Sequence, residues 1–170
     1  MKDIPSLVSS SPLEDLQLFN TIVMDDVNRL DDFVTAIIST HGSRLKRFSL
    51  HRLPISLKAL DDVCAGFTNL EQLFILVEQE DLVSLAGGYD TDSEYTNEFQ
   101  ESIGTSLSKA TRLQAVHINF VTLQAEGSHS SYVSTRDALR IVNRCSPTVT
   151  QIGCATRVWQ VSLVPNVRFG

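Results

Sequence analysis

A six-residue apolar pattern occurs five times along the chain, and it constrains the fold more than any other feature. Each copy has apolar residues at its first, fourth and sixth positions, and the copies occupy residues 13–18, 45–50, 70–75, 113–118 and 149–154. The last positions of each copy alternate between apolar and polar residues, which is the period of a β-strand with one buried face. The sequence therefore predicts five strands that share one phase.

Sequences typical of helices separate these copies. The candidate helices cover residues 25–40, 56–65, 99–110 and 134–145. The first carries a continuous apolar stripe at helical spacing, and Gly42 follows it where a helix commonly ends. The third is weaker, because Gly104 is expected to interrupt it. Strands that alternate with helices favour a parallel sheet joined by helical crossovers.

Two architectures contain such a sheet, a doubly wound fold and a solenoid of strand–helix repeats. The central strands of a doubly wound sheet are unbroken apolar runs, because helices cover both faces. Here polar residues such as Gln17, Ser49 and His117 alternate with the apolar ones, which leaves one face uncovered. The prediction is therefore an α/β solenoid, with about five parallel strands lining a curved sheet and helices on its outer face.

The chain of 170 residues is expected to form a single domain over residues 1–170. An acidic loop insertion at about residues 87–98 accounts for the long spacing between the third and fourth copies. No apolar run is long enough to span a membrane, and the first residues do not resemble a signal peptide. Three cysteines without metal-ligand spacing, Cys64, Cys145 and Cys154, indicate a reducing compartment. We therefore expect an intracellular protein, cytoplasmic or nuclear.

No catalytic or cofactor-binding motif is recognisable. The four histidines lack motif-spaced partners, and no phosphate-binding glycine pattern occurs. An acidic run matches five ligand positions of a calcium loop, but Tyr95 stands where the loop needs glycine. The matching residues are Asp90, Asp92, Glu94, Glu98 and Glu101. We expect no enzymatic activity, no metal and no cofactor.

A basic cluster lies between Arg44 and Lys58 and holds five of the 14 basic residues. The net charge of the chain is −6, and an acidic protein binds nucleic acid only where its positive charge is concentrated. The cluster lacks the interleaved aromatic residues expected for single-stranded nucleic acid. It is better explained by a charge-polarised partner surface or by a solvated face, so nucleic acid is not an expected partner.

The repeated pattern resembles that of leucine-rich-repeat proteins. A closer likeness, to the repeat regions of fungal F-box/leucine-rich-repeat proteins, covers about residues 40–160. The stretches that carry it are His41–Phe48, Phe67–Ile75, Ala138–Pro147 and Val149–Gln160. In that family the F-box recruits a ubiquitin ligase core and the repeats hold a substrate. No F-box is recognisable in the first forty residues.

The resemblance implies a non-enzymatic protein–protein interaction module that recognises a substrate for an F-box-like ubiquitin ligase adaptor. The alternative is a small doubly wound α/β enzyme or ligand-binding domain. A cleft at the carboxyl ends of the strands would favour the alternative, because ligands of open α/β sheets bind there. An uncovered sheet without such a cleft would favour the module.

The candidate partner-binding residues are those that alternate with the buried strand positions. They are expected on the uncovered face, where aromatic side chains with polar neighbours suit a protein interface. Phe74 and His117 are expected on that face, and the residues beside them in sequence beneath it. The full set is Phe19, Arg47, Ser49, His51, Gln72, Phe74, Leu76, His117, Asn119 and Gln151.

The two ends of a repeat array need protection, because each repeat buries one side against its neighbour. At the C-terminal end Trp159 is expected to cover the last repeat. Before the first strand, residues 1–12 hold little apolar material. We therefore expect the edge of the strand at Leu13–Leu18 to be open, so that the chain is either the tail of a longer repeat array or a protein that associates through this edge.

Overall fold

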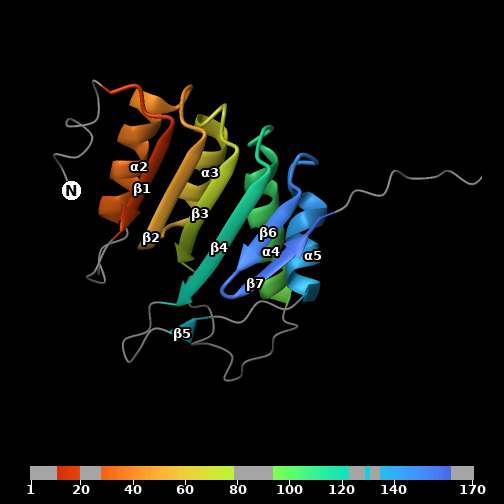
Figure 1. Cartoon of the computed structure of the whole chain (residues 1–170). Coiled ribbons are helices and arrows are strands. Elements are labelled where there is room, and N and C mark those ends of the chain that lie inside the picture. Colours follow the sequence, from red (N-terminus) through yellow and green to blue (C-terminus); the bar gives the residue numbers. More distant parts are fainter. Residues whose placement is uncertain (1–10, 20–27, 79–93, 123–128, 131–134, 162–170) are drawn as a thin grey trace, which may run out of the picture.

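The five copies of the apolar pattern form five parallel strands of one sheet. A computed structural model describes residues 11–19, 28–78, 94–122, 129–130 and 135–161. The parallel strands are β1 (Asp15–Phe19), β2 (Arg47–Ile55), β3 (Gln72–Glu78), β4 (Ala115–Thr122) and β6 (Gln151–Cys154). They lie side by side in sequence order (Figure 1). Two antiparallel strands complete the sheet: β5 (His129–Ser130) pairs with β4, and β7 (Arg157–Gln160) pairs with β6.

Four helices connect the parallel strands and lie on one side of the sheet (Figure 1). They are α2 (Asn28–His41), α3 (Leu57–Gly66), α4 (Glu94–Ser108) and α5 (Thr135–Arg144). We call the opposite side of the sheet the open face. No described helix covers it, whereas a doubly wound sheet would need helices on both sides. None of the helices in the described ranges has the length and apolarity needed to cross a membrane.

Equivalent positions of the five copies are also aligned with one another across the sheet. The third residue of each copy is aligned across all five strands, in the order Asp15, Arg47, Gln72, Ala115 and Gln151. The backbone hydrogen bonds repeat in the same way. The carbonyl of Glu14 accepts the N–H groups of Lys46 and Arg47 at 2.8 and 3.0 Å, and the same pairing recurs at each following strand. One short pattern therefore sets both the strand positions and their alignment.

The apolar positions of the pattern form the core between the sheet and the helices. The leucines of the second copy, Leu45 and Leu50, are fully buried, and so are most of their equivalents. At the β1 edge Leu16 is buried, while Leu18 is half-buried and packs against the same core. Burial of each large apolar side chain contributes about 1.5–3 kcal/mol to stability. The core is thus the main source of stability on the helix side.

Helix α4 differs from the predicted helix in two ways. It begins at Glu94, so residues 94–98 of the expected acidic loop are helical, and residues 87–93 lie outside the described residues. It also continues through Gly104. A Cβ atom on Gly104 would lie 2.6 Å from Cβ of Arg144 and 2.6 Å from the carbonyl oxygen of Ile141. The glycine therefore does not interrupt the helix but allows α4 and α5 to pack closely.

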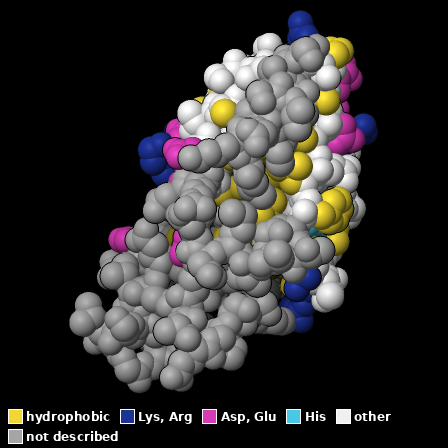
Figure 2. Space-filling view, turned by 90° about the vertical axis from the view of Figure 1, so that its left-hand side faces the viewer, with side chains coloured by type: hydrophobic (Ala, Val, Ile, Leu, Met, Phe, Trp, Pro, Cys, Tyr) yellow, Lys and Arg dark blue, Asp and Glu magenta, His cyan; other side chains and the backbone are white. Residues whose placement is uncertain are grey.

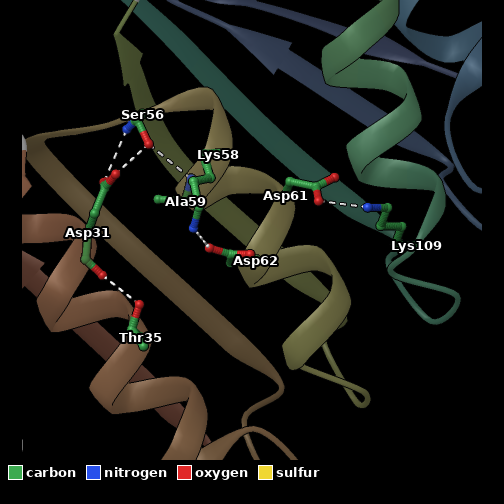
Figure 3. A network of polar contacts seen from close by, with 8 residues as sticks. All are labelled: Asp31, Thr35, Ser56, Lys58, Ala59, Asp61, Asp62 and Lys109. Atoms are coloured by element: carbon green, nitrogen blue, oxygen red, sulfur yellow. Dashed lines mark hydrogen bonds and ion pairs between the residues drawn. The ribbon is translucent and has the colours of Figure 1, made fainter.

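Polar contacts connect neighbouring helices on the outer side (Figure 3). Ser56 is the N-cap of α3, where its hydroxyl accepts the N–H of Ala59 at 3.0 Å and donates to the carboxylate of Asp31 on α2. Between α3 and α4, Lys109 donates to Asp61 at 2.6 Å. Each N-cap of this kind contributes about 1 kcal/mol. These contacts hold α3 against the helices on either side of it.

Strand β2 contains an irregularity that no other described parallel strand shows. Ser49 pairs with Phe74 and Pro54 pairs with Leu76. The two paired residues are thus five positions apart in β2 but only two positions apart in β3. Within this bulge Arg52 has a φ of 60°, in the left-handed region that non-glycine residues rarely adopt. The extra residues change the direction of the side chains that follow Ser49.

We predict that Gly104→Ala destabilises the protein by about 1–3 kcal/mol, because the added methyl group overpacks the α4–α5 contact. This loss should exceed the gain of up to about 1 kcal/mol from alanine's higher helix propensity. Urea unfolding followed by circular dichroism measures the change. Thr105→Ala, an exposed neighbour on the same helix, is the matched control and should be neutral or stabilising. Equal stability of both variants would contradict the packing role of Gly104.

Candidate partner-binding face

Four aromatic rings from four adjacent strands stack in a row on the open face. We call this row, made of Phe19, His51, Phe74 and His117, the ring ladder. The ring centroids are 4.1 Å apart for Phe19 and His51, 4.2 Å for His51 and Phe74, and 4.7 Å for Phe74 and His117. The interplanar angles are 1°, 29° and 12° in the same order. Each inner ring therefore has a neighbour on both of its faces.

The alternation of the strands places these rings on one side. Leu73, Ile75, Val116 and Ile118 lie beneath the sheet and are buried, whereas Phe74 and His117 are half-buried on the open face. The expected placement of both residues is thus confirmed. Two of the stacked pairs, Phe19 with His51 and Phe74 with His117, are also partners in the strand register.

The stacking of His51 on Phe74 is diagonal across β2 and β3. In the strand register the partner of Phe74 is Ser49, two residues before His51. Aromatic side chains can reach such diagonal neighbours. The contact between His51 and Phe74 therefore joins the two stacked pairs into one continuous ladder.

His117 ends the ladder at a tightly packed position. A Cβ atom on Gly153 of β6 would collide with Nδ1 of His117, so only glycine leaves room for this imidazole. Burial lowers the pKa of His117, and this effect exceeds the opposing effect of hydrogen bonds to Asn119 and to the backbone of Ala155. The side-chain oxygen of Asn119 also accepts the N–H of Ala155 at 2.8 Å. His117 is thus held in place from two sides.

The open face also has a shallow hollow of about 240 Å³, and Phe74 and His117 of the ladder line it. Its lining mixes apolar residues with polar ones, and the polar ones include amide side chains at Gln17, Gln72 and Gln151. Arg47 also lines it and donates to the carboxylate of Asp15 at 2.8 Å. The hollow lies towards the amino ends of the strands, so it is not the carboxyl-end cleft that would favour a doubly wound enzyme.

The structure places all ten candidate residues on the strands of the open face. Four of them form the ring ladder, and Leu76 and Asn119 are register partners towards the carboxyl ends. Arg47, Ser49, Gln72 and Gln151 line the hollow. Gly153 and Val158 also line the hollow. Val158 belongs to β7, which was not predicted as a strand. The sequence of β7 is part of an apolar run and does not contain a sixth copy of the six-residue pattern.

The other sequence candidates lead to no second site in the described residues. No group of three potential metal ligands occurs there. Of the calcium-like run, Glu101 is helical and pairs with Arg144 at 2.9 Å, while Asp90 and Asp92 lie outside the described residues. Burial raises the pKa of the Cys64 thiol to about 12 and that of Cys154 to about 11. Both are poor nucleophiles and poor metal ligands as folded.

The basic cluster is largely neutralised within the protein. Lys46 pairs with Glu14 at 2.9 Å, Arg47 with Asp15 at 2.8 Å and Lys58 with Asp62 at 2.7 Å. A surface of paired charges offers little attraction to the phosphates of a nucleic acid.

Comparison of the sequence with protein-family models and with curated proteins finds no match. Function is therefore inferred from the open face, which combines stacked rings, amide side chains and a shallow hollow. Such a combination is typical of surfaces that contact proteins, in which aromatic residues supply area and amides supply hydrogen bonds.

We predict that Gly153→Ala moves His117 away from Phe74, because the new methyl group occupies the position of the imidazole. The pKa of His117 should then rise towards the ordinary value of about 6.5, since burial is the main cause of its lowering. An NMR titration of the imidazole protons measures this change. Ala115→Ser, which adds one atom elsewhere on the same face, should leave the titration unchanged. An unaltered His117 in Gly153→Ala would show that the glycine is not required.

Proposed function

We propose that the protein is a non-catalytic interaction module that binds a protein partner along the open face. The observation that carries this proposal is the ring ladder, a row of four stacked rings on a sheet face that no described helix covers. The strand–helix units follow one another in sequence order with one phase, which suits a leucine-rich-repeat-like solenoid. In such an array the uncovered face of the sheet serves as an extended binding surface.

The ladder is suited to binding because its rings are already ordered. An immobilised side chain loses less conformational entropy on association than a free one, by about 0.5–1.5 kcal/mol for each rotamer-rich chain. Phe19 remains 71% exposed at the end of the row, so it can still bury apolar surface against a partner. The amides next to the ladder can hydrogen-bond to the backbone of a bound segment.

The resemblance to F-box/leucine-rich-repeat proteins extends the proposal to the fate of the partner. In that reading the bound protein is a substrate that a ubiquitin ligase modifies, and the module works in the cytoplasm or nucleus. Depletion of the module should then lengthen the lifetime of the bound protein in a cycloheximide chase. An unchanged lifetime would remove the ubiquitin-related part of the proposal and leave the binding function.

Site-specific photo-crosslinking in cells tests the binding face. A photoreactive residue at Gln72, exposed on the open face, should capture a defined partner. The same residue at Lys58, which is exposed on the helix side, is the matched control and should not capture it. Capture from Gln72 should fall severalfold in Arg47→Glu and in Phe74→Ala, because each removes a contact of the open face. Capture that is equal from both positions, or unchanged in both folded variants, would contradict the proposal.

We further propose that the edge of β1 allows weak self-association. Within the described residues β1 pairs only with β2, so its outer edge has no partner strand there. Seen from the side of β1 and α2, hydrophobic side chains are visible among the described atoms (Figure 2). Unpaired strand edges are ready templates for pairing with another chain.

Light scattering after size-exclusion chromatography should show an apparent mass that rises with protein concentration. Gln17→Pro should reduce this rise, because proline removes a backbone donor and is tolerated on an edge strand. Circular dichroism confirms that the variant is folded. A mass that stays monomeric at all concentrations would contradict self-association through this edge.

A further inference from the structure

Ala115 lines the hollow of the open face and has the smallest side chain of its row. The register aligns Asp15, Arg47, Gln72, Ala115 and Gln151 across the five parallel strands. Gln72 and Gln151 are thus the two register neighbours of Ala115. Their Cα atoms lie about 10 Å apart, because adjacent strands are separated by about 4.8 Å. Between the two amide side chains Ala115 contributes only a methyl group, so the gap is open to one flat group that stands on it.

The volume of the hollow limits what it can hold. Clefts that bind drug-sized molecules have volumes of about 300–1,000 Å³. The hollow, at about 240 Å³, is too small for such a ligand. A buried cavity of about 150 Å³ already holds one benzene ring. The hollow therefore has room for a single aromatic ring with a small substituent, which is the size of one side chain of a bound segment.

Aromatic and apolar side chains surround this space. Phe74 and His117 line the hollow with their stacked rings, and Val158 of β7 lines it as well. Val158 is 53% exposed, so it still has apolar surface to bury. A ring above Ala115 lies beside His117, two residues further along the same strand, and beside Phe74 on the next strand. Aromatic rings attract one another in offset-stacked or edge-to-face contacts, so these neighbours favour an aromatic occupant.

Two amides at the hollow have hydrogen-bonding groups that are not used within the described residues. The side chains of Gln72 and Gln151 make no hydrogen bond there, whereas that of Gln17 donates to Asp15 at 3.5 Å. An amide side chain has two donors and an acceptor. When a partner covers the hollow, these groups lose water, which costs free energy unless the partner pairs with them. The occupant therefore needs a polar group that can both donate and accept.

The charges around the hollow favour a neutral occupant. Among the described residues that line it, Arg47 is the one with a permanent charge, and the carboxylate of Asp15 pairs with it at 2.8 Å. Burial lowers the pKa of His117, which favours the uncharged imidazole. A charged side chain in the hollow would lose hydration without gaining a counter-ion. Carboxylates and ammonium groups are therefore poor occupants.

We propose that the hollow binds a tyrosine side chain of the partner segment. Its ring fills the space above Ala115, and its hydroxyl group hydrogen-bonds to the amides of Gln72 and Gln151. This inference rests on the proposed function of the open face and specifies the side chain that anchors the partner. Tyrosine combines an apolar ring with one group that donates and accepts, and it is enriched among the residues that carry most of the binding energy in protein interfaces.

Titration of the full chain with side-chain analogues, followed by NMR, tests the proposal. The probes are p-cresol, toluene and p-toluate, which share one ring and differ in its polar substituent. p-Cresol should bind saturably in the millimolar range, as expected for a ligand of few atoms, and should shift the side-chain amide signals of Gln72 and Gln151. Toluene should bind about two- to tenfold more weakly, the ratio for one net hydrogen bond. p-Toluate should also bind more weakly than p-cresol, because its charge finds no unpaired cation.

Variants assign the binding to the hollow. Ala115→Leu fills the space and should abolish the saturable binding of p-cresol. Thr35→Leu adds the same side chain at an exposed position of α2 and is the matched control. Gln72→Met combined with Gln151→Met keeps the side-chain length but removes the amides, so p-cresol and toluene should then bind equally. The NMR spectrum of each variant shows whether it is folded.

Equal binding of the three probes to the unmodified chain, or no saturable binding of p-cresol, would overturn the proposal. Binding of p-cresol that persists in folded Ala115→Leu would overturn it as well. None of these results affects the proposed interaction function, which the crosslinks from Gln72 test separately. Conversely, p-cresol binding at the hollow without those crosslinks would support the aromatic pocket and contradict capture of a cellular protein.

Discussion

The fold depends on one repeated backbone interaction. In the first four copies of the apolar pattern, the carbonyl at the second position accepts two N–H groups from the residues that begin the next copy's strand, at Glu14, Lys46, Glu71 and Gln114. In this register the apolar positions of every strand lie on the helix side, and a slip of one residue would exchange the two faces of the sheet and expose them. The Val161 N–H bonds in turn to the carbonyl of Thr150 at 2.8 Å, where β7 covers the last strand. Trp159 packs there against the core, as expected for a terminal cap.

Because the register is constant, glycines at contact points and a few ion pairs are enough to pack the helices on the other side of the sheet. Gly42 and Gly66 allow α2 and α3 to approach closely, and Gly104 does the same for α4 and α5. The ion pairs of these helices are mostly exposed, and such pairs contribute about 0–1 kcal/mol each. Their effect is therefore mainly to align the helices, while the buried core supplies the stability.

The sequence was sufficient to predict the parallel strands, the helices between them and the side on which each strand residue lies. These features depend on the spacing of apolar residues along the chain, which can be read from one sequence. The β2 bulge, the early start of α4 and strand β7 were not predicted, because they depend on tertiary contacts. The ring ladder also depends on tertiary contacts. Its members could be named, but the diagonal stacking of His51 on Phe74 could not be seen from the sequence, and Gly153 matters because His117 lies against it.

Parallel sheets are usually covered on both faces, so an uncovered one needs another way to protect its backbone. A surface that only had to remain in water would place charged side chains there. Instead β3 from Gln72 to Leu76 and β4 from Ala115 to Asn119 direct no lysine, arginine, aspartate or glutamate to the open face. The stacked rings cover the strands partly and remain accessible at their edges. The central strands of the open face are thus neither charged nor fully buried, which supports the proposal that a partner completes their burial.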